Sequence, residues 1–346
     1  MRTERPTVPR WLVKALMMFA MLLSACGQAT TGTGNDPLNV ETTVVPTSLQ
    51  PVALAAGQQL QVVATTNIIG DVVSQVGADQ IELTTLMVTG IDPHSYVPTP
   101  TDAAAINEAD VVFANGAGLE ANLAEIFESA GGDAIRVYLS QGLELRASAD
   151  AAASAEAPAG APAGDEHGHE AGEMDPHVWF DVRNVIHWVD TIQGTLAALD
   201  PAHGQVYEKN AQAYTTQLEE LDGWVVDQIA TIPEANRKLV TNHLSFGYLA
   251  DRYGLEQIGA VYPLNPSSEP SARDIAALQD LILELGVPAI FAESTVNPKL
   301  AQQVAQDTGT ALVPLYSGSL GEAGSGAETY IQLIRTDVKA IVDALQ

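Results

Sequence analysis

Short, nearly continuous apolar runs alternate with stretches of helical spacing from residue 59 onward. Residues 61–66, 81–87 and 111–114 are rich in Val, Ala, Leu and Phe, which is typical of strands buried on both faces. Buried strands that are separated by helices form parallel sheets with helices on both sides. The first half of the chain is therefore expected to fold as an α/β lobe.

The same alternation returns in the second half of the chain. Residues 238–241, 289–292 and 311–315 form three further apolar runs, and a capping-box sequence precedes the helical spacing of residues 271–285. Between the halves, residues 201–229 keep a helical spacing without an internal proline, which predicts a helix about 42 Å long. The pattern predicts an α/β protein of two lobes, each with a mostly parallel sheet flanked by helices, joined by one long helix.

Two stretches lack the apolar residues needed for a core. Residues 27–58 are rich in Thr, Gly, Pro and Ala and are expected to form a flexible stalk. Residues 147–173 are rich in Ala, Pro and Gly, carry six acidic residues and contain His167 and His169, which predicts a mobile loop. This loop is either a solvated linker or a segment that holds metal loosely and delivers it to a binding site.

The N-terminus has the features of an export signal. Residues 1–25 contain four basic residues and an apolar core at 15–23, which is far shorter than the roughly 20 residues of a spanning helix. The segment ends in Leu-Ser-Ala before Cys26, which resembles a bacterial lipobox. Cys26 is the only cysteine, so no internal disulfide can form. We expect a protein exported and lipid-anchored at Cys26 to the outer face of the cell membrane; the alternative is an ordinary secretory signal with an incidental Cys.

Removal of this signal leaves 321 residues with 11 basic and 42 acidic side chains, a formal charge of −31. Such a surface should repel nucleic acid and attract cations weakly, but charge this diffuse does not form a site. The length suits two domains better than one core. The expected divisions are a signal at 1–25, a stalk at 26–58, an N-terminal lobe at 59–200, a linking helix at 201–232 and a C-terminal lobe at 233–346.

One short phrase occurs twice: Asp-Pro-His, one further residue, then an aromatic. It places His94 before Tyr96 and His177 before Trp179. His94, His243 and Glu293 follow predicted strands, and ligands of open parallel sheets bind outside the carboxyl ends of strands. We therefore expect the three histidines, His94, His177 and His243, to converge on one metal ion. Three aromatic residues are expected to exclude water from it: Tyr96, Trp179 and Phe246.

Two other histidines lack such settings. His187 lies in a helical stretch beside Trp188, and His203 follows Asp200-Pro201 at the start of a helix. Both are interpreted as structural.

The phrases together resemble those of the metal-specific substrate-binding lipoproteins of bacterial ABC importers, the zinc/manganese (cluster A-I) group. Four phrases carry the resemblance, which extends from about residue 59 to the C-terminus: residues 90–100, 175–181, 242–248 and 291–294. The His-containing acidic loop before Asp175 resembles the loop of zinc-specific members.

The resemblance implies two lobes joined by a rigid helix, with one metal in the cleft between them. It makes His94, His177 and His243 ligands, and Glu293 a residue behind them or an occasional ligand. The family often has an Asp as fourth ligand, but the matching position here is Gly318. The fourth position is then left to water or Glu293. Three imidazoles favour Zn²⁺ over Mn²⁺, which prefers carboxylate oxygen.

The resemblance thus predicts a monomer, not an enzyme, that captures a divalent metal and hands it to an ABC permease. A zinc hydrolase or hydratase is the first alternative, since three His with an open fourth place also describe a catalytic zinc, with Glu293 as base. No His-Glu-x-x-His or Gly-x-Ser-x-Gly motif supports it. A metal-binding surface adhesin is the second.

Overall fold

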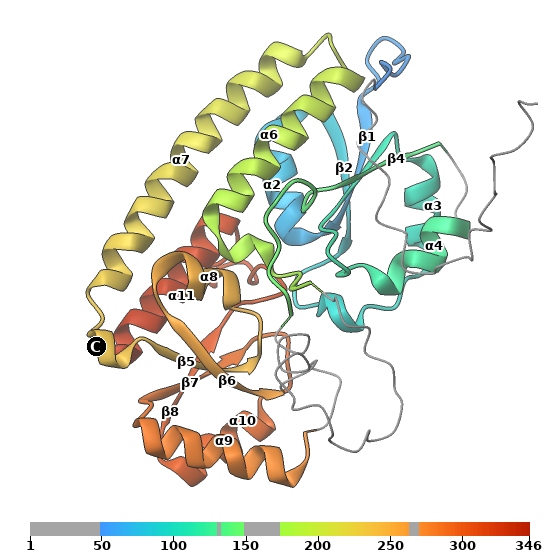
Figure 1. Cartoon of the computed structure of the whole chain (residues 1–346). Helices are drawn as coiled ribbons and strands as arrows, with labels where there is room; N and C mark the ends of the chain where they lie inside the picture. Colours follow the sequence, from blue (N-terminus) through green and yellow to red (C-terminus); the bar gives the residue numbers. More distant parts are fainter. Residues whose placement is uncertain (1–48, 130–132, 149–173, 263–269) are drawn as a thin grey trace, which may run out of the picture. The chain divides into compact units, whose positions relative to one another are not determined.

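Two parallel sheets form the framework of the chain (Figure 1). The computed structural model describes residues 49–129, 133–148, 174–262 and 270–346. The first sheet has the strand order β2-β1-β3-β4, and the second has the order β6-β5-β7-β8. The strands of the first sheet are β1 (Leu60–Thr66), β2 (Ile81–Met87), β3 (Val111–Ala114) and β4 (Ile135–Tyr138). Those of the second are β5 (Lys238–His243), β6 (Glu256–Tyr262), β7 (Ala289–Glu293) and β8 (Ala311–Leu315).

In each sheet the first strand along the chain is a central one, and later strands are added first on one side and then on the other. The resulting switch points lie between β1 and β3 and between β5 and β7. At such a point the loops after two neighbouring strands leave in opposite directions, which opens a place for a ligand at the carboxyl ends. The two lobes therefore offer equivalent binding edges.

Helices cover both faces of each sheet, as the buried strands require. In the N-terminal lobe these are α2 (Asn67–Gly77), α3 (Pro100–Glu108), α4 (Ala124–Ser129) and α6 (Val182–Leu199). In the C-terminal lobe they are α8 (Gly247–Tyr253), α9 (Ala272–Leu285), α10 (Lys299–Thr308) and α11 (Tyr330–Leu345). The predicted capping box is present, with Ser271 as N-cap and Asp274 as its partner, and Gly286 ends α9 in the left-handed conformation.

Helix α7 (Gly204–Ala230) is the predicted long helix, and it contacts α2 and α6 as well as α8 and α11 (Figure 1). One apolar cluster continues from β1 through α6 and α7 into β7 and α11, with members such as Trp188, Leu218 and Leu333. Separate clusters fill the outer faces of the two lobes. Because close-packed interiors transmit displacement instead of absorbing it, this shared core ties the two sheets together.

The predicted fold class, two parallel-sheet α/β lobes flanked by helices, is confirmed. Some boundaries were wrong. His243 and Glu293 were expected to follow strands, but each is the last residue of one, β5 and β7 respectively. The edge strands β4 and β6 were not predicted. Their alternation is weak because edge strands also carry polar residues such as Arg136 and Gln257.

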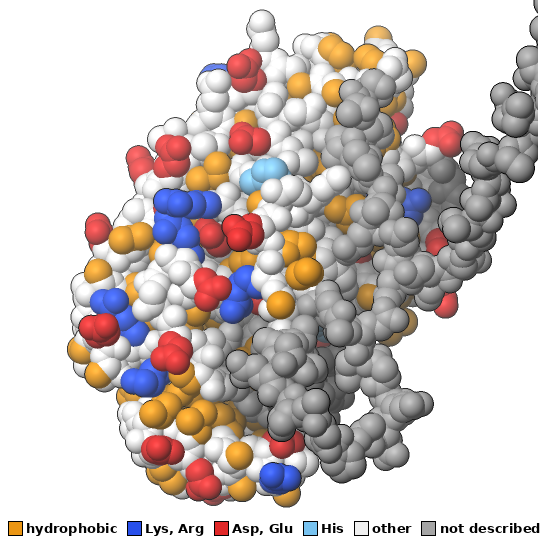
Figure 2. Space-filling model, in the orientation of Figure 1, with side chains coloured by type: hydrophobic (Ala, Val, Ile, Leu, Met, Phe, Trp, Pro, Cys, Tyr) orange, Lys and Arg blue, Asp and Glu red, His pale blue; other side chains and the backbone are white. Residues whose placement is uncertain are grey.

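Three further observations bear on the earlier expectations. No helix among the described residues is long and apolar enough to cross a bilayer. The signal with Cys26, most of the stalk and the segment with His167 and His169 lie outside the described residues. Figure 2 shows acidic and basic side chains interspersed on the visible face, in keeping with a diffuse charge.

Candidate metal centre

The two Asp-Pro-His phrases share one turn, in which the Asp side chain accepts from the backbone N–H of the His. In the first, the side chain of Asp92 accepts a hydrogen bond from the backbone N–H of His94 at 3.0 Å, and Pro93 begins a 3₁₀ helix, Pro93–Ser95. In the second, Asp175 accepts from the N–H of His177 at 3.0 Å. An Asp that binds the backbone two residues on is a common turn device, and the proline between fixes the backbone further. The repeated phrase therefore holds the backbone of its histidine in a fixed conformation.

The second copy goes one step further than the first. Asp175 Oδ1 also lies 2.8 Å from His177 Nδ1, and both side chains are buried. The carboxylate thus accepts a hydrogen bond from Nδ1–H, which leaves the lone pair of His177 on Nε2.

His243 is held by an equivalent arrangement in the C-terminal lobe. Its Nδ1 lies 2.9 and 2.8 Å from the two carboxylate oxygens of Glu293, which ends the neighbouring strand β7. The backbone N–H of His243 also donates to Glu293 at 2.9 Å, and Ser245 Oγ donates at 3.1 Å. Nε2 of His243 is therefore also left as a lone-pair donor.

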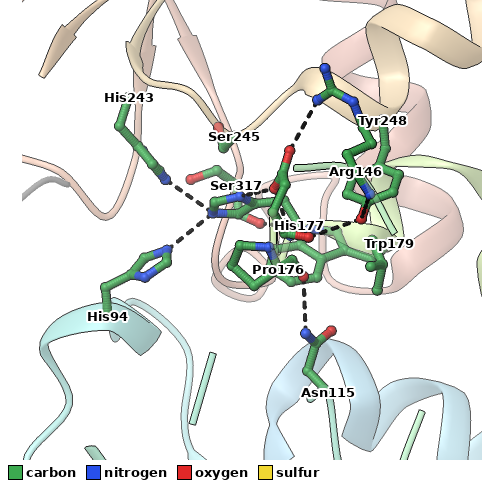
Figure 3. Close-up of polar contacts among 12 residues, drawn as sticks. His94, Asn115, Arg146, Pro176, His177, Trp179, His243, Ser245, Tyr248 and Ser317 are labelled. Carbon is green, nitrogen blue, oxygen red and sulfur yellow. Dashed lines mark hydrogen bonds and ion pairs between the residues drawn. The ribbon is translucent and has the colours of Figure 1, made fainter. Parts of the chain in front are cut away.

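The three predicted ligands converge at the junction of the lobes (Figure 3). His177 Nε2 lies 3.0 Å from His94 Nε2 and 3.1 Å from His243 Nε2. Nitrogens on a tetrahedral zinc at ~2.0–2.1 Å would lie roughly 3.3 Å apart. Because Nδ1–H of His177 and of His243 donates to Asp175 and Glu293, the Nε2 lone pairs of these two residues face each other unless a cation lies between them. The geometry is that of a cation site.

Electrostatics distinguish the histidines. Burial, and then the nearby His177 and His243, hold the pKa of His94 well below its usual value. Burial alone would lower the pKa of His243 too, but the charge and hydrogen bond of Glu293, with Asp92 and Asp175 behind, raise it overall. His94 is therefore neutral at physiological pH, whereas the raised pKa of His243 lets protons compete with a metal for its Nε2 as the pH falls.

Glu293 lies behind His243. It is almost fully buried, and burial raises its pKa, but His243 and the hydrogen bonds around it lower the pKa overall. Among the described residues, only His94, His177 and His243 form a cluster of potential metal ligands. The two carboxylates, Asp175 and Glu293, supply negative charge next to the site without facing its centre.

The loop after β3 binds the backbone next to His177. Asn115 Nδ2 donates to the carbonyl of Pro176 at 2.9 Å (Figure 3). Asn115 is fixed in turn by Glu120, whose carboxylate accepts from the N–H groups of Asn115 and Gly116 and from the Thr65 hydroxyl. Burial raises the pKa of Glu120. The β1/β3 switch point thus holds His177 in place through its backbone.

The expected aromatic shield is formed only in part. Trp179 packs edge-on against His177 with 5.4 Å between ring centroids, and its Nε1 donates to the carbonyl of Ser317. Phe246 packs on Phe180 at 4.4 Å. Tyr96 donates its hydroxyl to Asp102 at 2.7 Å. Among the described residues, Trp179 is the one aromatic of the three with a ring contact to a site histidine.

His187 and His203 are not brought to the site. His187 Nε2 lies 2.9 Å from the carbonyl of Gln141, and His203 Nδ1 lies 2.6 Å from Asp200. Gly318, the position where the resemblance placed a fourth ligand, packs against the first phrase. A Cβ at Gly318 would come within 2.7 Å of Pro93 Cδ.

Sequence reasoning missed the residues that support the histidines. The one available signal concerned Asp175, because both Asp-Pro-His phrases carry an Asp at that position. Asn115 donates to the carbonyl of Pro176 over a gap of 61 residues, and Arg146 donates to Asp175 over a gap of 29, so no spacing along the chain marks them.

The chain is similar in sequence to proteins that are named for metal binding. Residues 62–344 match the family model described as "Zinc-uptake complex component A periplasmic". The manganese-binding lipoprotein MntA of Halalkalibacterium halodurans is 31% identical over 331 residues, which cover 95% of this chain and 96% of the relative. The zinc-binding protein TroA of Treponema pallidum is 32% identical over 301 residues, covering 85% and 91%.

Solved structures give the same result. The periplasmic zinc-binding protein TroA of Treponema pallidum superposes with a TM-score of 0.72 at 29% identity, covering 83% of this chain and 99% of that one. A Mn-bound periplasmic metal-binding protein of Candidatus Liberibacter asiaticus superposes with a TM-score of 0.70 at 26% identity, covering 84% and 100%.

Proposed function

The chain belongs to the zinc-uptake component A family of substrate-binding proteins, and on that premise we propose that it captures Zn²⁺ outside the cytoplasm for delivery to an ABC permease. The resemblance recognised from the sequence is thereby confirmed, as is the prediction that the chain is not an enzyme. At the coarser level, the chain is the divalent-metal-binding component of an ABC transporter.

The donor set supports zinc as the cargo. Three imidazole nitrogens lie within 4.8 Å of one another. The carboxylates of Asp175 and Glu293 bind the Nδ1 atoms of His177 and His243 and do not join this group of ligand atoms. Nitrogen donors suit zinc, whereas manganese favours carboxylate, carbonyl and water oxygen. The similar proteins include both manganese and zinc binders by name, so our preference for zinc rests on the donor set.

Gly318 supports the same assignment. Pro93 occupies the space next to it, so a side chain at 318 would have to displace the segment that carries His94. We propose that His94, His177 and His243 are the protein ligands, that water completes the tetrahedron, and that Glu293 positions His243 without coordinating.

The remaining parts of the proposal concern location and partners. Cys26 is proposed as the lipid-bearing residue that anchors a monomer to the outer face of the membrane, where the permease is its partner. Several similar proteins are themselves named lipoproteins, which is consistent with this anchor.

Calorimetry at pH 7.5 on the metal-free protein tests the function. We expect one tightly bound Zn²⁺ per chain and the loss of most of that affinity in His177→Ala, because His177 contacts both other ligands. His187→Ala is the matched control, since His187 binds only a carbonyl at the lobe surface. Undiminished zinc affinity in His177→Ala would refute the three-histidine site.

A further inference from the structure

Arg146 links the C-terminal lobe to Asp175, the carboxylate that binds His177. Its Nη1 lies 3.0 Å from Asp175 Oδ2, and its Nε lies 2.6 Å from Asp251 Oδ2 on helix α8. Asp175 uses its other oxygen for His177. Two ion pairs and a hydrogen bond therefore link Asp251 on α8 through Arg146 and Asp175 to His177. Arg146 and His177 are both drawn in Figure 3.

The backbone around Arg146 is fixed independently of its side chain. The N–H of Asp175 donates to the carbonyl of Arg146 at 2.9 Å, and Ala147 pairs with Met174 in an antiparallel bridge. The Tyr248 hydroxyl donates to the carbonyl of Asp175 and accepts from the N–H of Arg146. A change of the Arg146 side chain thus leaves these contacts in place.

The local sequence leaves room for the guanidinium. Gly247 is the first residue of α8, and a Cβ there would lie 1.3 Å from Arg146 Nη1 and 3.0 Å from Asp175 Oδ2. The Tyr248 ring lies beside the group, with the guanidinium carbon 5.7 Å from the ring centroid. The missing side chain at 247 is what allows Arg146 to reach Asp175.

We propose that Arg146 is a positioning residue for the metal centre: it holds Asp175 in the orientation that fixes His177, and it anchors that pair to the C-terminal lobe through Asp251. A planar guanidinium suits this role because its fork of donors binds two carboxylates at once, which a single ammonium group does less well. This proposal rests on the proposed function, since it concerns the same metal site.

The test measures Zn²⁺ affinity of the full exported protein by chelator competition, in a double-mutant cycle. Partners behind a metal-binding histidine typically change metal affinity about 10–100-fold. We expect Arg146→Gln to raise the Kd about tenfold and Asp175→Asn to raise it at least as much. If Arg146 acts through Asp175, the double variant should match Asp175→Asn within about twofold. Arg273→Gln, which removes an exposed arginine on α9, should bind as the wild type does.

Two further variants separate positioning from general stability. Gly247→Ala keeps the arginine but displaces its guanidinium, so it should reproduce the loss seen in Arg146→Gln. Arg146→Lys should recover part of the affinity. With Co²⁺ as probe, the visible absorption bands should change in Arg146→Gln, because His177 is less well oriented, and stay unchanged in Arg273→Gln.

The outcomes distinguish the two hypotheses. Wild-type affinity in Arg146→Gln, or losses that multiply in the double variant, would overturn the role of Arg146 while leaving the metal function intact. If the wild type binds no Zn²⁺, the metal function and this proposal both fail.

Discussion

Replacement of Glu293 by Gln tests how the site controls the proton on His243. The substitution keeps the volume of a fully buried side chain but removes its charge, and it leaves one oxygen in place of two to accept from Nδ1–H of His243. Partners of a metal-binding histidine are typically worth about 10–100-fold in affinity, or roughly 1.4–2.7 kcal/mol. We expect a loss of zinc affinity in this range at pH 8.

The loss should depend on pH in a defined direction. In the wild type, Glu293 raises the pKa of His243 above 6.5, so protons compete with zinc as the pH falls through that raised value. In Glu293→Gln the largest cause of the rise is gone, only the weaker effects of Asp92 and Asp175 oppose burial, and the pKa of His243 falls, so competition begins at lower pH. The ratio of the two Kd values should therefore be largest near pH 8 and narrow toward pH 6.

Isothermal titration with Zn²⁺ in matched buffers between pH 6 and pH 8 measures this ratio. Glu284→Gln, at an exposed position of α9, removes one acidic charge away from the site and is the matched control. A ratio that stays constant over the whole range would refute the reasoning, because Glu293 would then not set the proton affinity of His243.

Three further predictions follow from neighbouring contacts. Ser319→Ala removes the hydroxyl that accepts from Gly90 N–H and Asn67 Nδ2 across the lobes; stopped-flow chelation should show zinc release several-fold faster, and an unchanged rate would contradict a role in holding the His94 segment. Gly318→Asp should weaken zinc binding at equilibrium, because its Cβ meets Pro93; tighter binding would show that a fourth protein ligand fits. In the metal-free protein, the raised pKa of His243 adds to the free energy of unfolding, fully below pH 6.5, and this contribution is lost as the pH rises through the raised pKa. The lowered pKa of Glu293 also adds to the free energy of unfolding, and that contribution is lost only as the pH falls below 4.5. The urea midpoint of the wild type should exceed that of Glu293→Gln most between about pH 4.5 and 6.5, and a gap that widens toward pH 8 would contradict the sign.

The central strands could be predicted because their side chains are buried on both faces and must be apolar. The run at 111–114 is the central strand β3 without a change of boundary. The runs at 81–87 and 311–315 are β2 and β8, which are edge strands that still carry enough apolar residues to be recognised. Edge strands are less constrained, and Gly259 in β6 further weakens the pattern. The ends of the central strands β5 and β7 were missed for another reason: each strand ends on a buried polar residue, His243 and Glu293, whereas the apolar run in the sequence stops before it.

The ligands could be predicted from local chemistry, but their supports could not. A histidine held by Asp-Pro carries its function in its own neighbourhood, and two such phrases are informative. Arg146, Asn115 and Ser319 acquire their roles only when the fold brings distant segments together. The fold also changes the meaning of Gly318: its sequence position suggests a missing ligand, whereas its contact with Pro93 shows that the space is filled.

Metal competition tests the central claim most directly. The metal-free protein would be dialysed against equal concentrations of Zn²⁺ and Mn²⁺ at pH 7.5, and its metal content measured by mass spectrometry. The three-histidine site predicts one Zn²⁺ per chain and almost no Mn²⁺, because its donors are imidazole nitrogens. Occupancy by Mn²⁺ equal to or above that of Zn²⁺ would contradict it.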